Sequence, residues 1–384
     1  MLSLDHDERA RQQYALALNR YVQTTLAEGS RLVCDRVVVP ALGLTGIRDR
    51  LERRRLRQRM EREPQHRLWL AMMQVWQDLL WRYSGECVDR QLDTLVERCR
   101  LRSGAAARLR LDASLELPAY QLAVDNHSLP GGYHAETRED DVRQGAIYAL
   151  SSTTYLLQQT GPRHEIRGHP LLGHVRMRFP DLVPAAVLDL GCLVGASTAV
   201  YAELLPSARI EAIDTSAPAL RFAAGSASER GLAIGFSRQN AEHTDFPDGS
   251  FDLVVSHALL HETSRTAVRN IFTESLRLLR PGGVMAHIEV PARIESLDPW
   301  EYLRSAYEGH YNQEPFWNGV VEEDLAQIAT AAGFVEAHQG FQQVVPDAAV
   351  PPVGASFVPV DAGRLDLGNW FVVSARKPAT GGKS

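Results

Sequence analysis

The chain is nearly without lysine and has few cysteines. Only Lys377 and Lys383 are lysines among its 41 basic residues, so arginine supplies almost all of the positive charge. The formal net charge is −6 at pH 7, which argues against a broad surface for nucleic acid, because such surfaces are strongly basic. The four cysteines include no CxxC pair, so neither a zinc knuckle nor a disulfide framework is expected. This pattern favours a reducing, cytoplasmic compartment.

The sequence also lacks a long apolar run. Its most apolar stretch, Leu68–Trp81, is interrupted by Gln74 and Asp78 and is too short to cross a bilayer. The N-terminus, MLSLDHDERARQQ, has acids where a signal peptide has a basic start. With 384 residues, 45% of them hydrophobic and 23% charged, the chain is expected to form about two globular units without a membrane segment.

Residues 1–125 predict a mainly α-helical N-terminal domain that serves in packing, in dimerisation or as a substrate cap. Apolar residues recur at helical spacing after Asp5, and Gly29 is a plausible end of a helix. Because Leu68–Trp81 is apolar on more than one side, it is expected to be buried in a core or against a second copy of the chain, as in a homodimer. The arginine-rich run Arg50–Glu63 is interpreted as a solvated helix face, with a basic docking patch as the alternative.

Residues 126–180 predict a connector and active-site lid. The segment Ser128–His134 has turn chemistry followed by two polar aromatic side chains, and Gly145–Pro162 is a long stretch without charge. A connector of this kind lies over a core or covers a site. Three of its side chains are expected to line a substrate pocket: Tyr133, His134 and Tyr148.

From residue 181 to residue 380, short β-rich runs alternate with helical runs. This alternation is typical of an α/β fold in which helices cover both faces of a mostly parallel sheet. Strands are expected at Val187–Leu190, Ile210–Ile213, Ile234–Ser237, Leu253–Ser256, Val284–Val290 and Trp370–Ser374. Helices are expected at Ser197–Leu205, Ala217–Arg230, Arg265–Leu279 and Val321–Ala332.

The strongest functional signal is VLDLGCLVG, residues 187–195. An apolar strand leads into Asp189, then Gly191 and Gly195, and then into a helix whose first N–H groups are free. A dinucleotide-binding loop would read G-x-G-x-x-G, with a pyrophosphate at the helix N-terminus. Here an acid replaces the first glycine, which disfavours a pyrophosphate and favours a cationic amino group.

Two further loops are expected at the same edge of the sheet. Asp214 ends the second strand, where a carboxylate can accept hydrogen bonds from ribose hydroxyls. Asn240 and Ala241 follow the third strand, where an amide side chain and a backbone N–H can bind the edge of an adenine ring. An amino-acid head, a ribose and an adenine together describe S-adenosylmethionine.

These motifs occur in order, and the region from Ala185 to Lys377 resembles the class I S-adenosylmethionine-dependent methyltransferases. EAID (Glu211–Asp214) is similar to the second motif of that family, and LLRPGG (Leu278–Gly283) is similar to its turn into the fifth strand. NAEHTDFPDGSFDLVVSHALLHE (Asn240–Glu262) resembles the adenine loop and fourth strand of the small-molecule branch. The helical first half resembles a bacterial group of such enzymes with extended N-termini.

The resemblance implies a Rossmann-like, seven-stranded, mostly parallel sheet with helices on both faces, preceded by the helical domain. It also implies S-adenosyl-L-methionine as the cofactor. The expected cofactor-binding residues are Asp189, Gly191, Gly195, Asp214, Thr215, Asn240, Ala241, Ser256 and Tyr155. Tyr155 is included because relatives often place an aromatic residue against the cofactor just before the catalytic fold.

The residues after the fourth strand suggest where chemistry takes place. His261 is interpreted as the residue that faces the substrate and acts as a general base or orients an acceptor oxygen, because histidine titrates near neutral pH. If the segment after the fourth strand is helical, His257 and His261 share one face of it. His257 and Glu289 are further catalytic candidates, and a purely structural role is the alternative for each of the three residues. No metal is expected, because no third ligand follows H-x-x-x-H at a metal-binding spacing.

An insertion at residues 291–319 is rich in aromatic and hydrogen-bonding side chains. A plain connection at this point would be about 2–6 residues long. The insertion is therefore interpreted as a substrate lid that excludes water, with mere packing as the alternative. Its expected substrate-binding residues are Tyr307, Tyr311, Asn312 and Trp317.

The predicted function is transfer of a methyl group to O, N or S of a small molecule by in-line displacement. An RNA methyltransferase is a second hypothesis, and the net charge disfavours it. The residues after the fourth strand also disfavour it, because Ser256–Leu259 reads SHAL and not an aromatic NPPY-like motif. A catalytically silent fold used for dimerisation or partner binding is a third hypothesis. The intact cofactor motifs argue against it, since an idle fold needs neither Asp189 nor Asp214.

Overall fold

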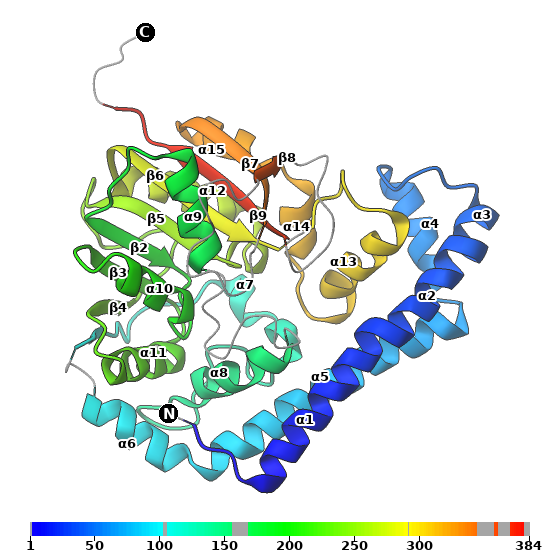
Figure 1. Cartoon of the computed structure of the whole chain (residues 1–384), viewed down its shortest axis with the longest axis horizontal. Helices are drawn as coiled ribbons and strands as arrows, with labels where there is room; N and C mark the ends of the chain where they lie inside the picture. The colour runs from blue at the N-terminus through cyan, green and yellow to red at the C-terminus, as the bar shows by residue number, and fades with distance from the viewer. Residues whose placement is uncertain are drawn as a thin grey trace.

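The computed structural model describes residues 2–102, 106–155, 168–290, 292–343, 357–359 and 369–379. Residues 156–162 of the uncharged stretch Gly145–Pro162 and the first residue of the insertion 291–319 lie outside these ranges. The described residues form a sheet with the strand order β1-β4-β3-β2-β5-β6-β9-β7-β8 (Figure 1). The strands are β1 (Arg108–Arg110), β2 (Ala186–Leu190), β3 (Arg209–Asp214), β4 (Ile234–Arg238), β5 (Phe251–His257), β6 (Leu279–Glu289), β7 (Val335–Gln343), β8 (Phe357–Pro359) and β9 (Asn369–Arg376).

The sheet confirms the expected Rossmann-like arrangement. Strands β1 to β6 pair in parallel, whereas β9 runs antiparallel to both β6 and β7. The seven strands of the expected sheet lie at its centre, and β1 and β8 extend its two edges. All five residues of β2 are buried, as is typical of a central parallel strand covered on both faces.

Helices cover both faces of the sheet, each over its own apolar core. One face carries α9 (Gly168–Arg178), α10 (Ala196–Leu204) and α11 (Ala217–Glu229), and the other carries α12 (Arg265–Leu278) and α15 (Leu325–Ala332). The helix expected at Val321–Ala332 is divided, because Asp324 caps the start of α15. The residues before it belong to the short helix α14 (Trp317–Glu322).

The first hundred residues confirm the expected long helical region. Its helices lie along one flank of the molecule, away from the sheet (Figure 1). They are α1 (His6–Tyr21), α2 (Ala27–Val33), α3 (Val39–Leu42), α4 (Arg50–Met60), α5 (Pro64–Arg90) and α6 (Leu92–Arg102). No described helix combines the length and the apolar character that a bilayer crossing requires.

Helix α5 buries its tryptophans inside the chain. Trp69 and Trp76 are each 1% exposed. The ring of Trp69 packs against Trp300 of α13 (Pro299–Tyr311), and the ring of Trp76 packs against Tyr155 of α8 (Arg143–Tyr155). The apolar stretch 68–81 was expected to be buried either in a core of the same chain or against a second copy. These two rings are buried in a core of the same chain. A homodimer through the N-terminal helices stays a prediction.

The arginine-rich helix α4 is largely solvated but has one buried arginine. Arg53 is 6% exposed, and its guanidinium donates to the backbone oxygen of Ile47 and to Glu322 of α14. Leu56 and Met60 are buried on the same helix. Helix α4 thus connects the N-terminal helices with the insertion that follows β6.

Candidate active site

A cavity of about 540 Å³ lies at the C-terminal ends of the central strands. Its wall includes the ends of β2, β3 and β5, the segment 120–155, and helices α5 and α13. Thr24 and the α5 residues Trp69, Met73 and Trp81 bring the N-terminal helices onto this wall. In open α/β sheets, ligands bind beyond the carboxyl ends of the strands, which is where this cavity lies.

The loop after β2 forms one end of the cavity. Asp189 is 1% exposed, and the hydroxyl of Thr198 in α10 donates to its Oδ2 over 2.5 Å. Gly191 has φ +67°, and a Cβ at this position would lie 2.7 Å from Cδ1 of Leu259. Glycine is therefore required at residue 191 for both its backbone conformation and the close approach of Leu259. Gly195, with φ +71°, is the N-cap residue directly before α10.

Asp214 at the end of β3 holds this loop in place. Its Oδ2 accepts from the backbone N–H of Leu193, and its Oδ1 accepts from that of Ser216, both over 2.8 Å. A carboxylate has about four acceptor positions, so further donors can still bind. Burial raises the pKa of Asp189 to about 7 and also raises the pKa of Asp214.

The adenine-loop candidates line the same cavity. Thr215, Asn240 and Ala241 belong to its wall. Oδ1 of Asn240 accepts from the backbone N–H of Glu242 over 2.9 Å, which fixes the turn after β4. Ser256 is buried behind the wall, where its Oγ bonds to Nδ1 of His287 over 2.8 Å. It stands behind the residues that line the cavity.

His257 and His261 reach the cavity from different backbone elements. His257 is the last residue of β5, and its Nε2 is hydrogen-bonded to the hydroxyl of Tyr201 over 3.1 Å. Ala258 follows with φ +53°, and His261 lies in the 3₁₀ turn Leu260–Glu262. The two imidazoles therefore do not share one helical face, because the strand continues to residue 257.

Glu289 orients His261 from behind. The carboxylate is fully buried, and its Oε2 accepts from Nδ1 of His261 over 2.7 Å while Oε1 accepts from the backbone N–H of Leu260 over 2.6 Å. A carboxylate only accepts, so Nδ1 carries the hydrogen and Nε2 points the other way. The imidazole lines the cavity and packs edge-on against Trp317, whereas Glu289 does not reach the wall.

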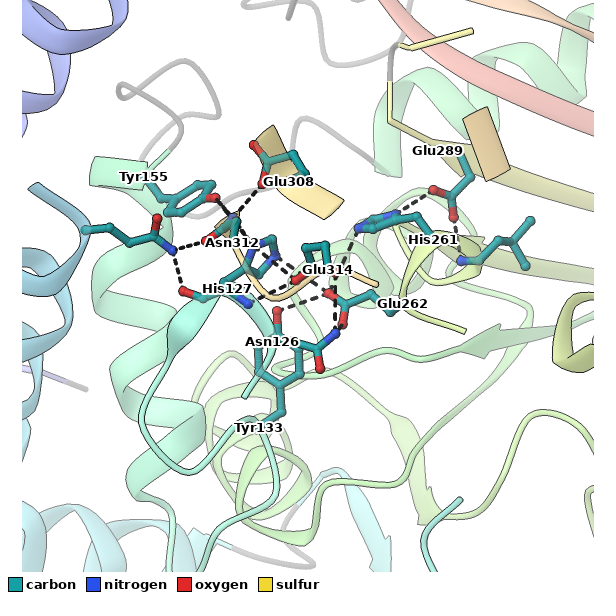
Figure 2. A network of polar contacts seen from close by, with 12 residues as sticks. Asn126, His127, Tyr133, Tyr155, His261, Glu262, Glu289, Glu308, Asn312 and Glu314 are labelled. Carbon is teal, nitrogen blue, oxygen red and sulfur yellow. Dashed lines mark hydrogen bonds and ion pairs between the residues drawn. The ribbon is translucent and has the colours of Figure 1, made fainter. Parts of the chain in front are cut away.

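A polar network missing from the sequence prediction surrounds this side of the cavity (Figure 2). Glu262 accepts from Nδ2 of Asn126 over 2.5 Å and from the hydroxyl of Tyr133 over 3.1 Å. Nε2 of His127 lies 3.6 Å from Glu262, and its Nδ1 lies 3.3 Å from Glu314. Glu314 also accepts from the backbone N–H of His127 over 3.0 Å. Two segments far apart in the sequence, 126–133 and 308–314, thus meet at Glu262.

Three carboxyl groups in this network have raised pKa values. Burial raises the pKa of Glu262 and of Glu308 to about 7, and burial together with the other two carboxylates raises that of Glu314 well above its ordinary value. Within the described ranges, no lysine or arginine forms an ion pair with any of the three. The side chains His127, Glu262 and Glu314 also form the single described group whose donor atoms, all within 4.8 Å of one another, could surround a metal ion. The expectation of no metal stays a prediction.

Comparison with known proteins identifies the domain that carries the cavity. Residues 187–283 match a protein-family model described as a methyltransferase domain. The chain contains a class I S-adenosylmethionine-dependent methyltransferase domain. The resemblance seen in the sequence motifs is thereby confirmed.

Known relatives of the methyltransferase domain match this chain in part. An uncharacterised methyltransferase of Synechocystis sp. is 30% identical over 148 residues, 38% of this chain and 66% of that protein. The trans-aconitate 2-methyltransferase of Azoarcus sp. is 36% identical over 114 residues, 30% of this chain and 42% of that protein. The chain thus spans less than two thirds of the length of these relatives. Two solved structures are each 18% identical to this chain with a TM-score of 0.39. One is phosphoethanolamine N-methyltransferase 2 of Haemonchus contortus, where the match covers 54% of this chain and 52% of that chain. The other is the N-methyltransferase NodS of Bradyrhizobium japonicum, where the match covers 62% of this chain and 98% of that chain.

The expected substrate residues divide into two groups in the structure. Tyr133, His134, Tyr148 and Trp317 line the cavity of the methyltransferase domain. The rings of Tyr133 and Tyr148 meet edge to face at 5.9 Å. Tyr155 also lines the cavity, but its hydroxyl accepts from Nδ2 of Asn312 over 3.0 Å and its ring lies against Trp76. The structure therefore places Tyr155 with the polar network as well as on the wall.

Tyr307, Tyr311 and Asn312 lie beside the cavity rather than on its wall. The ring of Tyr307 packs against Trp69, and the hydroxyl of Tyr311 donates to Glu61 over 2.5 Å. Tyr307 and Tyr311 are four residues apart in α13 and share the face that meets the N-terminal helices. The residues of α13 that line the cavity are their neighbours on this helix: Arg304, Ser305 and Glu308.

Proposed function

We propose that the chain transfers a methyl group from S-adenosylmethionine to a small-molecule acceptor enclosed in the cavity. The observation that carries this proposal is that Asp189, Asp214 and the glycine turn at Gly191 border one cavity at the C-terminal edge of a matched methyltransferase domain. Asp189 binds the ammonium of the methionine moiety, because a buried carboxylate needs a cationic partner. Asp214 accepts from the ribose hydroxyls, and the loop at Asn240 and Ala241 binds the adenine.

A small acceptor fits the enclosure better than a macromolecule does. Trp69, Met73 and Trp81 of α5 close the cavity opposite the sheet, and Trp317 closes it beside His261. Apolar walls exclude water from the sulfonium and its methyl group. We therefore assign the N-terminal helices and the described part of the insertion the role of a substrate cap. The net charge of −6 also disfavours a polyanionic acceptor.

His261 is the proposed general base. Its Nδ1 donates to Glu289, so Nε2 is the nitrogen that would accept a proton from the acceptor. In the transfer step, the acceptor atom attacks the methyl carbon in line with the breaking bond to sulfur. The protein's tasks are to align the two groups and to remove the proton.

Two measurements test this proposal. Calorimetric titration is expected to show binding of S-adenosylhomocysteine and no binding of NAD, because the carboxylate at residue 189 disfavours a pyrophosphate. Incubation with methyl-labelled S-adenosylmethionine is expected to label small molecules of a metabolite extract and to leave added RNA unlabelled. Binding of NAD in preference to S-adenosylhomocysteine would contradict the cofactor assignment. Label in the RNA fraction would contradict the acceptor class.

A further inference from the structure

Three carboxyl groups gather on the acceptor side of the cavity, and no described lysine or arginine forms an ion pair with any of them. Glu262 and Glu308 line the wall there, and Glu314 lies directly behind Glu262. Among the described lining residues, Arg304 is the only lysine or arginine; its charge acts on Glu308, four residues away in α13, and it forms no ion pair with Glu262. His127 lies between Glu262 and Glu314 and can balance at most one charge.

The hydrogen bonds that these carboxylates accept come mainly from neutral groups. Asn126 and Tyr133 donate to Glu262, and Nδ2 of Asn312 donates to Glu308 over 2.5 Å. Neutral donors fix the direction of a carboxylate without cancelling its charge. A buried carboxylate that keeps its charge is stabilised most by a cation, and a cationic ligand would supply the partner that the described residues do not provide for Glu262.

The rest of this wall suits an organic cation. Tyr133, Tyr148, Tyr155, Trp81 and Trp317 all line the cavity. The face of an aromatic ring attracts an ammonium group through its negative quadrupole. Carboxylates beside several aromatic rings therefore match an amine with an apolar skeleton better than they match an anion or a sugar.

A divalent metal ion fits this geometry less well. The two nitrogens of His127 face different carboxylates, Nδ1 toward Glu314 at 3.3 Å and Nε2 toward Glu262 at 3.6 Å. One ion can bind only one of these nitrogens, so it cannot use both close contacts. In addition, Glu308 lines the cavity but does not belong to the group that could surround an ion.

We infer that the acceptor is an amine, which binds as an ammonium between Glu262 and Glu308 and is methylated on nitrogen. This inference rests on the proposed methyltransferase activity and names its substrate class. Nε2 of His261 lies 4.0 Å from Oε1 of Glu262, so the base stands beside the group that binds the ammonium.

The step balances without a further reactant. One N–H bond of the ammonium breaks and its proton passes to Nε2 of His261, which leaves a lone pair on nitrogen. The lone pair forms the new N–C bond to the methyl carbon while the S–C bond breaks and its electron pair stays on sulfur. The products are S-adenosylhomocysteine and a methylated ammonium, and the proton on His261 is released to water.

A binding experiment tests this inference without knowledge of the natural acceptor. The protein is first titrated with S-adenosylhomocysteine, and the saturated complex is then titrated with phenethylamine, 2-phenylethanol and 3-phenylpropionate, which differ in their end group. Methylamine and spermidine extend the range of amine size. The best amine is expected to bind about tenfold or more tightly than the alcohol, as a charge-assisted hydrogen bond requires. Glu262→Gln and Glu308→Gln are expected to reduce this preference to less than about threefold.

The control is Glu97→Gln, a change of the same kind on the exposed surface of α6, which is expected to keep the full preference. Equal or tighter binding of the alcohol or the acid to the wild-type complex would overturn the inference, and so would failure of every amine in the series. Binding of Mn²⁺ or Zn²⁺ that is lost in Glu314→Gln would overturn it in favour of a metal. If S-adenosylhomocysteine itself does not bind, the proposed function fails instead. Because the comparison of end groups uses the wild type, it does not depend on the folding of any variant.

Discussion

Nδ1 of His261 donates to Oε2 of Glu289 over 2.7 Å, and the two side chains are 3% and 0% exposed. The imidazole therefore has one nitrogen held by a fully buried carboxylate and its other nitrogen directed toward Glu262 at the cavity wall. An arrangement of this kind fixes both the tautomer and the direction of a base. It is the basis of the first two predictions.

His261→Ala is expected to lower kcat by roughly 100-fold or more, which is the usual contribution of a positioned acid or base. The affinity for S-adenosylhomocysteine is expected to change by less than about twofold, because the cofactor carboxylates Asp189 and Asp214 belong to other strands. Steady-state kinetics and calorimetry on the same preparation measure both quantities. A parallel loss of cofactor affinity would assign His261 to the cofactor site or to a structural role.

Glu289→Gln tests the orientation of His261 alone. The amide keeps the size of the side chain and can still accept from the backbone N–H of Leu260, but it loses the charge that holds Nδ1. We expect kcat to fall by about tenfold with KM nearly unchanged, since the residue does not line the cavity. A rise in KM with kcat unchanged would instead indicate that the acceptor pocket has been distorted.

Two glycines with the same backbone conformation offer a matched comparison. Gly191 has φ +67° with Leu259 at 2.7 Å from its missing Cβ, whereas Gly231 has φ +70° and no atom within 4 Å. Gly231→Ala is therefore expected to cost only the backbone strain, about 1 kcal/mol. Gly191→Ala adds a steric clash and is expected to cost about 1–3 kcal/mol more, with weaker cofactor binding. Denaturant unfolding of both variants measures the difference, and equal losses would exclude the clash.

The parallel sheet could be predicted from the sequence because its strands are continuous apolar runs and its loops have local motifs. Asp189 lies near the end of β2, Gly191 follows that strand and Asp214 ends β3, so their common edge of the sheet follows from the direction of the strands. The edge strand β1 could not be predicted in this way. It has three residues, and its end residues Arg108 and Arg110 are exposed.

The polar network could not be predicted, because its members have no common spacing. His127, Glu262 and Glu314 come from three segments that only the tertiary structure brings together. The sequence also did not predict which residues of α13 line the cavity. The aromatic residues Tyr307 and Tyr311 of this helix are conspicuous in the sequence, but the structure places Tyr307 against Trp69 and lines the cavity with Glu308 instead.

The buried carboxyl groups make the free energy of unfolding depend on pH. The pKa of Asp189 in the folded chain is about 7, above its ordinary value of 3.8, so the folded state holds a proton that the unfolded state has already lost. Stability is therefore highest at low pH in this window and falls as the pH rises from about 4 to about 7, by up to about 1.4 kcal/mol per pH unit for one group. Glu262 and Glu308 act in the same direction. Unfolding of the ligand-free protein at several pH values is expected to show this slope, and Asp189→Asn is expected to reduce it.

The same carboxyl group predicts how cofactor affinity depends on pH. Below a pH of about 7, Asp189 is protonated in the free protein, and binding of the cofactor ammonium must expel that proton. The affinity for S-adenosylmethionine is therefore expected to fall by roughly tenfold for each pH unit below 7, with one proton released on binding. Calorimetry in buffers of different ionisation enthalpy measures the proton release directly.

Asp189→Asn is expected to bind S-adenosylmethionine more than tenfold more weakly at pH 7.5 and to lose the pH dependence, because the amide has no proton to expel. Asp181→Asn, at an exposed residue that pairs with Arg376, is the control and is expected to retain both the affinity and its slope. An unaltered slope in Asp189→Asn would show that another group binds the ammonium, and Asp214 would then be the first residue to examine.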